Sequence, residues 1–131
     1  MTATVYLDTS VVLAQLFAED RAPAEGLWSQ AFAASRLPEF EVFNRVHARG
    51  AAATHGADAR RLVDRVHLVE MTPQTLGRAL LPFAQPVRTL DALHLATLDF
   101  LRAQGLTPAV ATDDPRLAAA AVGLGFALAD C

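Results

Sequence analysis

The sequence predicts a single α/β domain, a three-layer α/β/α sandwich around a central, mostly parallel sheet of four to five strands. Short apolar runs of β-forming residues alternate with longer stretches of helical periodicity along the 131 residues. No repeat, linker or low-complexity segment interrupts this alternation. Strands that alternate with helices imply right-handed crossovers, which place helices on both faces of a parallel sheet.

The composition fits one globular domain over residues 1–131. Hydrophobic residues make up 53% and charged residues 19% of the chain, which allows a substantial core. The chain has no apolar run of membrane-spanning length and no secretory signal pattern at its N-terminus. The single cysteine, Cys131, leaves no intrachain disulfide or cysteine-based zinc site. We therefore expect a cytoplasmic protein that does not associate with membranes.

The charge pattern excludes several function classes. A net charge of −3 argues against a protein that coats nucleic acid through charge alone. The 11 basic residues are all arginines, so mechanisms that need a lysine, such as a P-loop or a Schiff base, are excluded. No Gly-rich loop follows the first apolar run, which disfavours a dinucleotide site.

The stretch over residues 4–10 begins with the first predicted strand, an apolar run that ends in Asp8 and two hydroxyl residues. These residue types stop a strand and cap a helix, so a helix is expected over residues 11–17. Apolar residues at helical spacing predict a second helix over residues 22–34. A short strand is expected to follow over residues 35–37.

The middle of the chain continues the alternation. Pro38 is typical of a first helical position, and a helix is expected from there to about residue 53. Its buried face would carry Phe40, Phe43 and Val46. Gly56 is expected to break the pattern before a short helix over residues 57–65. The residues V-H-L-V-E-M at 66–71 then alternate like a third strand.

The C-terminal half predicts three helices and two strands. Thr72 and Pro73 have the pattern of a cap and a first-turn proline, which opens a helix to about residue 81. Residues 89–103 form the most regular helical pattern, and residues 108–112 form a buried strand. Asp114 precedes Pro115 and opens a last helix through residue 122. Residues 126–128 could add an edge strand.

Four carboxylates fall at comparable places in this scheme. Asp8 ends the first strand, and Asp114 follows the late strand by two residues. Asp91 and Glu41 lie near the starts of helices. Because the carboxyl ends of parallel strands share one edge, where α/β proteins bind ligands, we expect these acids to meet there.

Such a cluster predicts a divalent-cation site. Packed carboxylates repel one another, and hard cations relieve that repulsion. Oxygen ligands without cysteine favour Mg²⁺ or Mn²⁺. Two such ions about 4 Å apart can activate water and stabilise the leaving oxygen in phosphoryl transfer. The count of ions, one or two, stays open.

A structural interpretation of the same acids also stays open. The helix dipole favours acids in first turns, so Asp91 and Asp114 could be ordinary first-turn or capping residues. Glu39 and Glu41 point about 200° apart on a helix, so only one of them can face the site. The spacing from Ser35 favours Glu41.

Three segments of the chain resemble the signatures of PIN-domain ribonucleases. They are L-D-T-S at residues 7–10, R-T-L-D-A-L-H-L-A-T at residues 88–97 and T-D-D-P-R-L at residues 112–117. The length and the order of the acids resemble the VapC-type toxins of bacterial type II toxin–antitoxin modules. The resemblance covers nearly the whole chain, and the segment around Asp91 is its most specific part.

The resemblance implies a metal-dependent endoribonuclease that uses Mg²⁺ or Mn²⁺, cleaves RNA, forms a homodimer or a higher-order toxin–antitoxin complex, and is inhibited by a cognate antitoxin. By position, the family's four acids correspond to Asp8, Glu41, Asp91 and Asp114. Ser10 and Thr112 correspond to hydroxyls that support the acids. The family's T-x-D pattern favours Asp114 over Asp113, which could still contribute through water.

Several other residues admit two interpretations. Arg45 lies four residues after Glu41 and is either a surface salt-bridge partner or a ligand of RNA phosphate. Arg88 and Arg116 flank matched acids and are also phosphate candidates. His94, one helical turn after Asp91, is interpreted as a packed histidine rather than a metal ligand or proton shuttle.

Two other functions would also place acids at this edge of the sheet. The first is a binding module of the same fold, whose acidic pocket receives a partner's basic side chain without catalysis. The second is a receiver-like or phosphatase domain, which also places acids at strand ends. A receiver needs a lysine, and the common phosphatase motif needs an aspartate where Ser10 stands, so the second is disfavoured.

Overall fold

The computed structural model describes residues 5–18 and 26–131, and a four-stranded parallel sheet forms its centre. The strands lie in the order β3-β2-β1-β4. Their bounds are β1 (Val5–Leu7), β2 (Phe32–Ser35), β3 (Val66–Val69) and β4 (Ala109–Ala111). The helices are α1 (Thr9–Phe17), the 3-10 turn η1 (Leu27–Ser29), α2 (Leu37–Ala48), α3 (Ala52–Asp64), α4 (Pro73–Ala79), α5 (Thr89–Ala103) and α6 (Pro115–Gly123).

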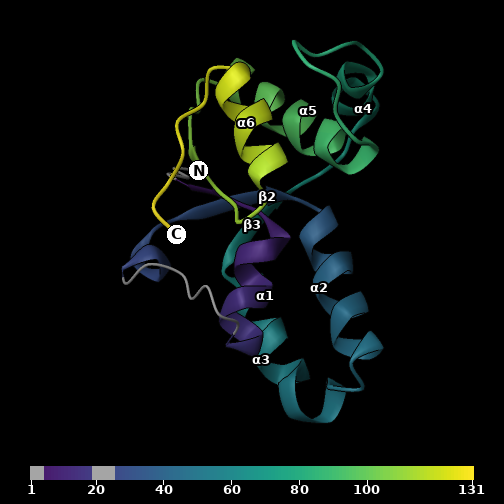
Figure 1. Cartoon of the computed structure of the whole chain (residues 1–131), viewed down its shortest axis with the longest axis vertical. Helices are drawn as coiled ribbons and strands as arrows, with labels where there is room; N and C mark the ends of the chain where they lie inside the picture. The colour runs from purple at the N-terminus through teal and green to yellow at the C-terminus, as the bar shows by residue number, and fades with distance from the viewer. Residues whose placement is uncertain (1–4, 19–25) are drawn as a thin grey trace.

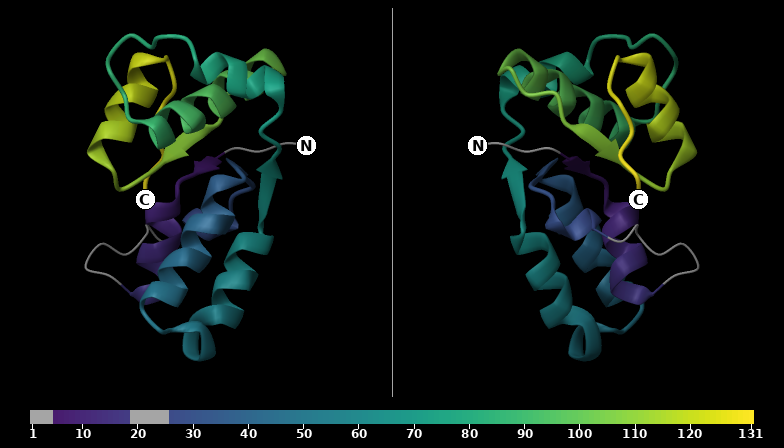
Figure 2. Two further views of the ribbon diagram at one scale, coloured as in Figure 1. Left: turned by 90° about the vertical axis from the view of Figure 1, so that its right-hand side faces the viewer. Right: turned by 90° about the vertical axis from the view of Figure 1, so that its left-hand side faces the viewer.

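The helices form a layer on each side of this sheet. Figures 1 and 2 show α1, α2 and α3 below the sheet and α4, α5 and α6 above it. The core is divided accordingly. Val5 and Leu7 of β1 belong to the cluster that contains α1, α2 and α3, whereas Tyr6 belongs to the cluster that contains α5 and α6. This alternation is the two-residue period of a strand buried on both faces. The predicted three-layer fold is confirmed.

The strand order creates a switch point beside β1. The chain runs from β1 outward through β2 to β3 and then returns to place β4 on the other side of β1. Leu7 pairs with Ala111, and the Asp8 amide donates to the Ala111 carbonyl at 3.0 Å. At such a point the crossovers diverge, which leaves a crevice at the carboxyl ends of the two strands.

The segment before β2 differs from the prediction. A helix was expected over residues 22–34 and a strand over residues 35–37; residues 22–25 lie outside the described residues. The rest of the segment forms η1 and then β2, whose four residues are all buried. Phe-Ala-Ala-Ser has no strong β propensity of its own, so its pairing with β1 and β3 decides its conformation.

Gly50, rather than Gly56, sets the boundary between α2 and α3. Gly50 has a left-handed backbone with φ of 63°, so α2 ends at Ala48 rather than near residue 53. Gly56 was expected to break the helical pattern, but it lies inside α3.

Phe40 was expected in the core, yet its side chain is 66% exposed. Val46 is buried as predicted and Phe43 packs partly buried against the core, whereas Val42 takes the buried place expected for Phe40.

The remaining predictions match more closely. The helix over residues 89–103 is observed, and Thr72 caps α4 by accepting from the Thr75 amide. The expected edge strand at residues 126–128 is reduced to one parallel bridge between Val110 and Leu128.

In the described part of the chain, no helix is both long and apolar enough to cross a membrane.

A charged cluster ties α4 and the C-terminal segment to α5. Asp99 accepts from Arg78 Nε at 2.8 Å and from Arg102 Nη2 at 3.0 Å. The two guanidinium groups also lie over the rings of Phe83 and Phe126. Burial alone would raise the pKa of Asp99, but the hydrogen bonds from Arg102 and Arg78 outweigh it and lower this pKa. The charged form of Asp99 therefore stabilises the fold.

We expect Asp99→Asn to lower the free energy of unfolding by about 1 kcal/mol at neutral pH, since it weakens two charge-assisted hydrogen bonds in a partly exposed cluster. Because the folded pKa is lowered, this contribution is present above about pH 4 and disappears as the pH falls through the lowered value. Urea unfolding across that range measures the difference.

Asp58→Asn is the matched control, because Asp58 pairs with Arg61 at the same three-residue spacing on an exposed helix face. It should change stability little at any pH. Equal effects of the two substitutions would contradict the structural role assigned to Asp99.

Candidate metal and phosphodiester site

A polar cavity of about 640 Å³ opens at the carboxyl ends of the strands, and acids from four separate segments line it. They are Asp8 after β1, Glu41 on α2, Asp91 on α5 and Asp114 before α6. The full lining comprises Asp8, Thr9, Ser10, Leu13, Glu41, Asn44, Arg45, Arg88, Thr89, Leu90, Asp91, His94, Asp114 and Arg116. The fold therefore brings together the four acids that the sequence singled out.

Asp8 has polar neighbours at both carboxylate oxygens. Its Oδ2 accepts from the Ser10 hydroxyl at 2.6 Å and from the Thr112 hydroxyl at 2.8 Å. Its Oδ1 lies 3.6 Å from Nε2 of His94. The Asp8 residue is only 7% exposed. These contacts come from α1, from the end of β4 and from α5, so they cross the switch point.

The two supporting hydroxyls also organise the loop after β4. The Asp113 amide donates to the Ser10 hydroxyl at 2.9 Å, and the Asp114 amide donates to the Thr112 hydroxyl at 3.0 Å. Asp113 therefore contributes a backbone group to this network. The Asp114 carboxylate accepts from the Arg116 amide at 2.9 Å and caps α6. Asp114 thus combines the capping interpretation with a place in the cavity wall.

Glu41 faces the cavity, while its neighbour Glu39 does not line it. Oε1 of Glu41 accepts from the Thr9 hydroxyl at 3.0 Å. Burial raises the pKa of Glu41, and the charges of Asp8 and Asp91 add to the increase, although the Thr9 hydrogen bond and His94 oppose it. Glu39 pairs instead with Arg36 at 3.4 Å and Arg60 at 3.1 Å. Helical geometry explains this division, because residues two apart point to different sides.

Asp91 and His94 reach the cavity from the first turns of α5. Asp91 is only 9% exposed, which is unusual for an acid that merely caps a helix at the surface. His94 is buried as predicted, at 3% exposure. Its Nδ1 lies 2.8 Å from the hydroxyl of Tyr6, and the two rings meet edge to face. Full burial raises the pKa of Tyr6, so its phenol stays neutral.

Three arginines surround the acids. Arg45 lies on α2, Arg88 immediately precedes α5, and Arg116 lies in the first turn of α6. All three line the acidic cavity. Guanidinium groups form bidentate hydrogen bonds with phosphate, so this arrangement can hold a polyanion beside the carboxylates.

The ligand atoms in this cavity are of the type that hard divalent cations prefer. The four carboxylates and the surrounding hydroxyls supply oxygen ligands, which Mg²⁺ and Mn²⁺ prefer. Burial is the main cause of the raised pKa of Glu41, and the charges of Asp8 and Asp91, which a cation would offset, add to it. Among residues 5–18 and 26–131, however, no three His, Cys, Asp or Glu side chains are arranged closely enough to ligate one ion.

Sequence reasoning did not single out Thr9, Asn44 or Tyr6. Thr9 belongs to L-D-T-S, but its position beside Asp8 gave no indication that it would contact Glu41, 32 residues away. Asn44 lies three residues after Glu41, so helical spacing could have placed it in the same wall. Tyr6 looked like an ordinary strand residue, and only the packing of α5 brings it to His94.

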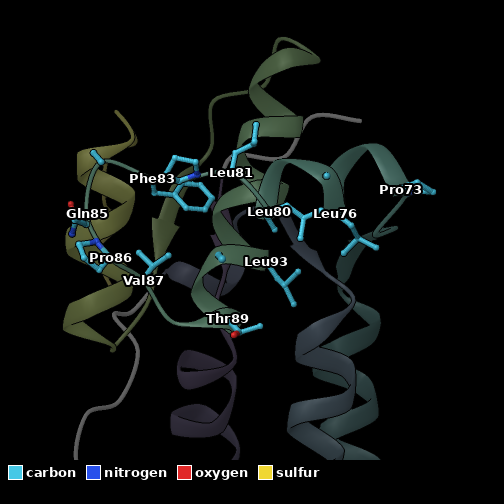
Figure 3. Close-up of a pocket in the computed structure, with 15 residues that line it drawn as sticks. Pro73, Leu76, Leu80, Leu81, Phe83, Gln85, Pro86, Val87, Thr89 and Leu93 are labelled. Atoms are coloured by element: carbon cyan, nitrogen blue, oxygen red, sulfur yellow. The ribbon is translucent and has the colours of Figure 1, made fainter.

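A second cavity, of about 760 Å³, lies between α4, α5 and the loop that joins them. Figure 3 shows Leu76 and Leu80 on one side, Phe83 and Pro86 from the loop, and Leu93 of α5. Leu80 is 87% exposed. Apolar surface of this kind commonly contacts another molecule. Thr89 lines both this cavity and the acidic one, so the two adjoin.

Comparisons with known proteins identify one family and two similar folds. The family model of the PIN domain matches residues 5–123. Among solved structures, VapC20 from Mycobacterium tuberculosis, a sarcin–ricin loop cleaving toxin, is similar with a TM-score of 0.67 and 20% identity over 97% of this chain and 99% of that chain. A toxin–antitoxin complex from Klebsiella pneumoniae gives a TM-score of 0.66 and 18% identity over 91% of this chain and 93% of that chain. No curated protein sequence matches the chain significantly.

We expect Glu41→Gln to raise the melting temperature of the metal-free protein at neutral pH. The substitution removes a partly buried charge that Asp8 and Asp91 repel, and it keeps an acceptor for Thr9. Because the folded pKa of Glu41 is raised, its penalty is absent well below the ordinary glutamate value and grows as the pH rises through the raised value. Calorimetric melting from about pH 4 to pH 8 tests this.

Glu39→Gln makes the same change on the same helix but removes two arginine pairs, so it should leave the melting temperature equal or lower. A Glu41→Gln variant that melts below the wild type at neutral pH would contradict the predicted repulsion.

Proposed function

This chain belongs to the PIN-domain family, and on that premise we propose that it is a divalent-metal-dependent endoribonuclease, the toxin of a toxin–antitoxin pair. One observation carries the proposal. Four acids that are far apart in the sequence line a single cavity at the switch point of a parallel sheet, with three arginines beside them. This combination suits the cleavage of a phosphodiester, in which the negative charge of the phosphate must be neutralised and the phosphate must be bound in position.

In this proposal Asp8, Glu41, Asp91 and Asp114 would hold Mg²⁺ or Mn²⁺. When bound, the cation would activate the attacking water and stabilise the negative charge that develops on the phosphate. Ser10 and Thr112 orient the Asp8 carboxylate, and Thr9 orients Glu41. The products expected from attack by water are a 5′-phosphate and a 3′-hydroxyl.

The arginines would hold the RNA backbone. Arg45, Arg88 and Arg116 approach the cavity from three different elements, so a bound strand would contact them on more than one side. Phosphate contacts of this kind position a strand and carry no sequence information. The choice of RNA would then depend on surfaces outside this acidic centre.

The toxin assignment rests on fold likeness to a toxin–antitoxin complex and to a toxin that cleaves the sarcin–ricin loop. By that likeness we propose a cognate antitoxin as partner. The exposed leucines around the apolar cavity give a partner chain a surface to cover. Homodimerisation stays a prediction that light scattering of the purified protein tests.

A binding module without catalysis is the alternative. Glu41 has a raised pKa, and the Asp114 carboxylate already caps α6, so the acids could receive a guanidinium from a partner instead of a metal. Titration calorimetry of the isolated chain with Mn²⁺ separates the two proposals. Heat of binding at submillimolar to millimolar Mn²⁺ supports the nuclease, and its absence supports the binding module.

We expect Asp8→Asn to lower RNA cleavage by more than about 100-fold, because it removes a proposed metal ligand whose geometry the surrounding groups preserve. Circular dichroism should show an intact fold. Expression of the two proteins in a bacterial host, scored by growth and by sequencing of RNA ends, measures the difference.

Asp64→Asn is the control for that experiment, because Asp64 pairs with Arg60 outside the cavity. It should cleave RNA like the wild type. Full cleavage by Asp8→Asn would refute the proposed site.

We expect Arg116→Gln to raise KM for RNA and to reduce the salt dependence of binding, with a smaller effect on kcat, because one phosphate contact is lost. Binding and cleavage assays at several salt concentrations measure both quantities. Arg61→Gln is the control, since Arg61 pairs with Asp58 away from the acidic cavity. Equal behaviour of the two variants would contradict the phosphate role of Arg116.

A further inference from the structure

His94 joins the acidic cavity to a tyrosine in the sheet. Tyr6 and Asp8 lie two residues apart on extended backbone, so their side chains point to the same side of the sheet. α5 packs on that side and places the His94 ring across both. Nδ1 lies 2.8 Å from the Tyr6 hydroxyl, and Nε2 lies 3.6 Å from Oδ1 of Asp8.

These neighbours determine which ring nitrogen carries the proton. An Nε2 lone pair directed at the Asp8 carboxylate would be repelled, whereas an Nε2–H is attracted to it. Nδ1 of the neutral ring must then be an acceptor, and the Tyr6 hydroxyl is the donor beside it. The Tyr6 oxygen in turn accepts from the Ser35 amide at 3.2 Å. This arrangement of hydrogens gives the Tyr6 hydroxyl and Nδ1 of His94 a hydrogen-bond partner, and it leaves Nε2–H in electrostatic contact with Asp8 at 3.6 Å.

The other arrangement of hydrogens, with the proton on Nδ1 of His94, is less favourable. Tyr6 also has hydrogen-bond contacts with the side chains of Ser35 and Thr97, and donation to either would require Nδ1–H on His94. The neutral ring would then turn a bare Nε2 toward Asp8. The Thr97 hydroxyl donates to the Leu93 carbonyl at 2.9 Å, so it could only accept from Tyr6, and the repulsion between Nε2 and Asp8 is what disfavours this arrangement.

We propose that His94, oriented by Tyr6, is a positioning residue whose Nε2–H holds the Asp8 carboxylate in place for a divalent cation. This inference rests on the proposed metal-dependent function. Ser10 and Thr112 hold one oxygen of Asp8, and His94 faces the other, so rotation of the carboxylate is opposed at both oxygens. Neither ring nitrogen of His94 keeps a free lone pair toward the cavity, so His94 is not itself a metal ligand.

The protonation pattern is testable in the metal-free wild type. Long-range ¹H–¹⁵N NMR spectra distinguish the two neutral forms of a histidine ring. We expect the His94 signals of the form protonated at Nε2. In Tyr6→Phe, which lacks the donor, the spectrum should shift toward a mixture of forms. A wild-type ring protonated at Nδ1 alone would overturn the proposal.

Two amide substitutions test the positioning role. The side-chain nitrogen of Gln can occupy the place of Nε2, whereas Asn is too short to reach Asp8. We expect His94→Gln to keep Mn²⁺ affinity and kcat near the wild-type values. His94→Asn should lose about 10-fold or more in both. Calorimetry with Mn²⁺, single-turnover RNA cleavage and thermal melting of both variants provide the measurements.

The outcomes separate the positioning role from the proposed function. Equal Mn²⁺ affinity in His94→Asn and the wild type would overturn the role of His94 alone. A wild type that binds no Mn²⁺ would overturn the proposed function and the role of His94 with it. If both variants lose affinity equally although they melt like the wild type, the Nε2–H contact is not what holds Asp8.

Discussion

The position of the Asp8 carboxylate depends on contacts that cross the join between β1 and β4. Thr112 donates to it from the end of β4, and Ser10 donates to it from the first turn of α1. Those hydroxyls also accept from the amides of Asp113 and Asp114, so the loop that opens α6 is held by the same network. Parallel pairing of Leu7 with Ala111 brings the two strand ends together. The geometry of the acidic cavity follows from this pairing.

Burial of several acids at one sheet edge has an electrostatic cost that the surrounding structure only partly offsets. The helix dipole favours Asp91, which lies in the first turn of α5. Hydroxyls of Ser10, Thr112 and Thr9 supply donors to Asp8 and Glu41. The raised pKa of Glu41 shows that repulsion and burial outweigh its donor. A bound cation would relieve this repulsion, which is the physical reason for proposing a cation as the ligand of this cavity.

Much of this architecture could be predicted from neighbouring residues. Thr72 and Asp114 cap their helices as their positions before Pro73 and Pro115 predict, and α5 covers the expected residues. The four acids were recognisable because each lies at a strand end or a helix start. The segment at residues 32–34 was misassigned, because its alanines fit a helix as well as a buried strand. Gly50 rather than Gly56 ends the preceding helix, a choice that depends on the left-handed backbone at the turn between α2 and α3.

The sequence alone determined the α/β class, through the alternation of strands and helices, and the acidic chemistry at the sheet edge where Asp8 ends a buried strand. These features arise from local periodicity, caps and residue type, which act over a few residues. Tertiary structure decided that Glu41 and not Glu39 lines the cavity, and that His94 lies between Tyr6 and Asp8. Tyr6 and His94 are 88 residues apart in the sequence. Contacts at that separation depend on how the helices pack on the sheet, which no local pattern encodes.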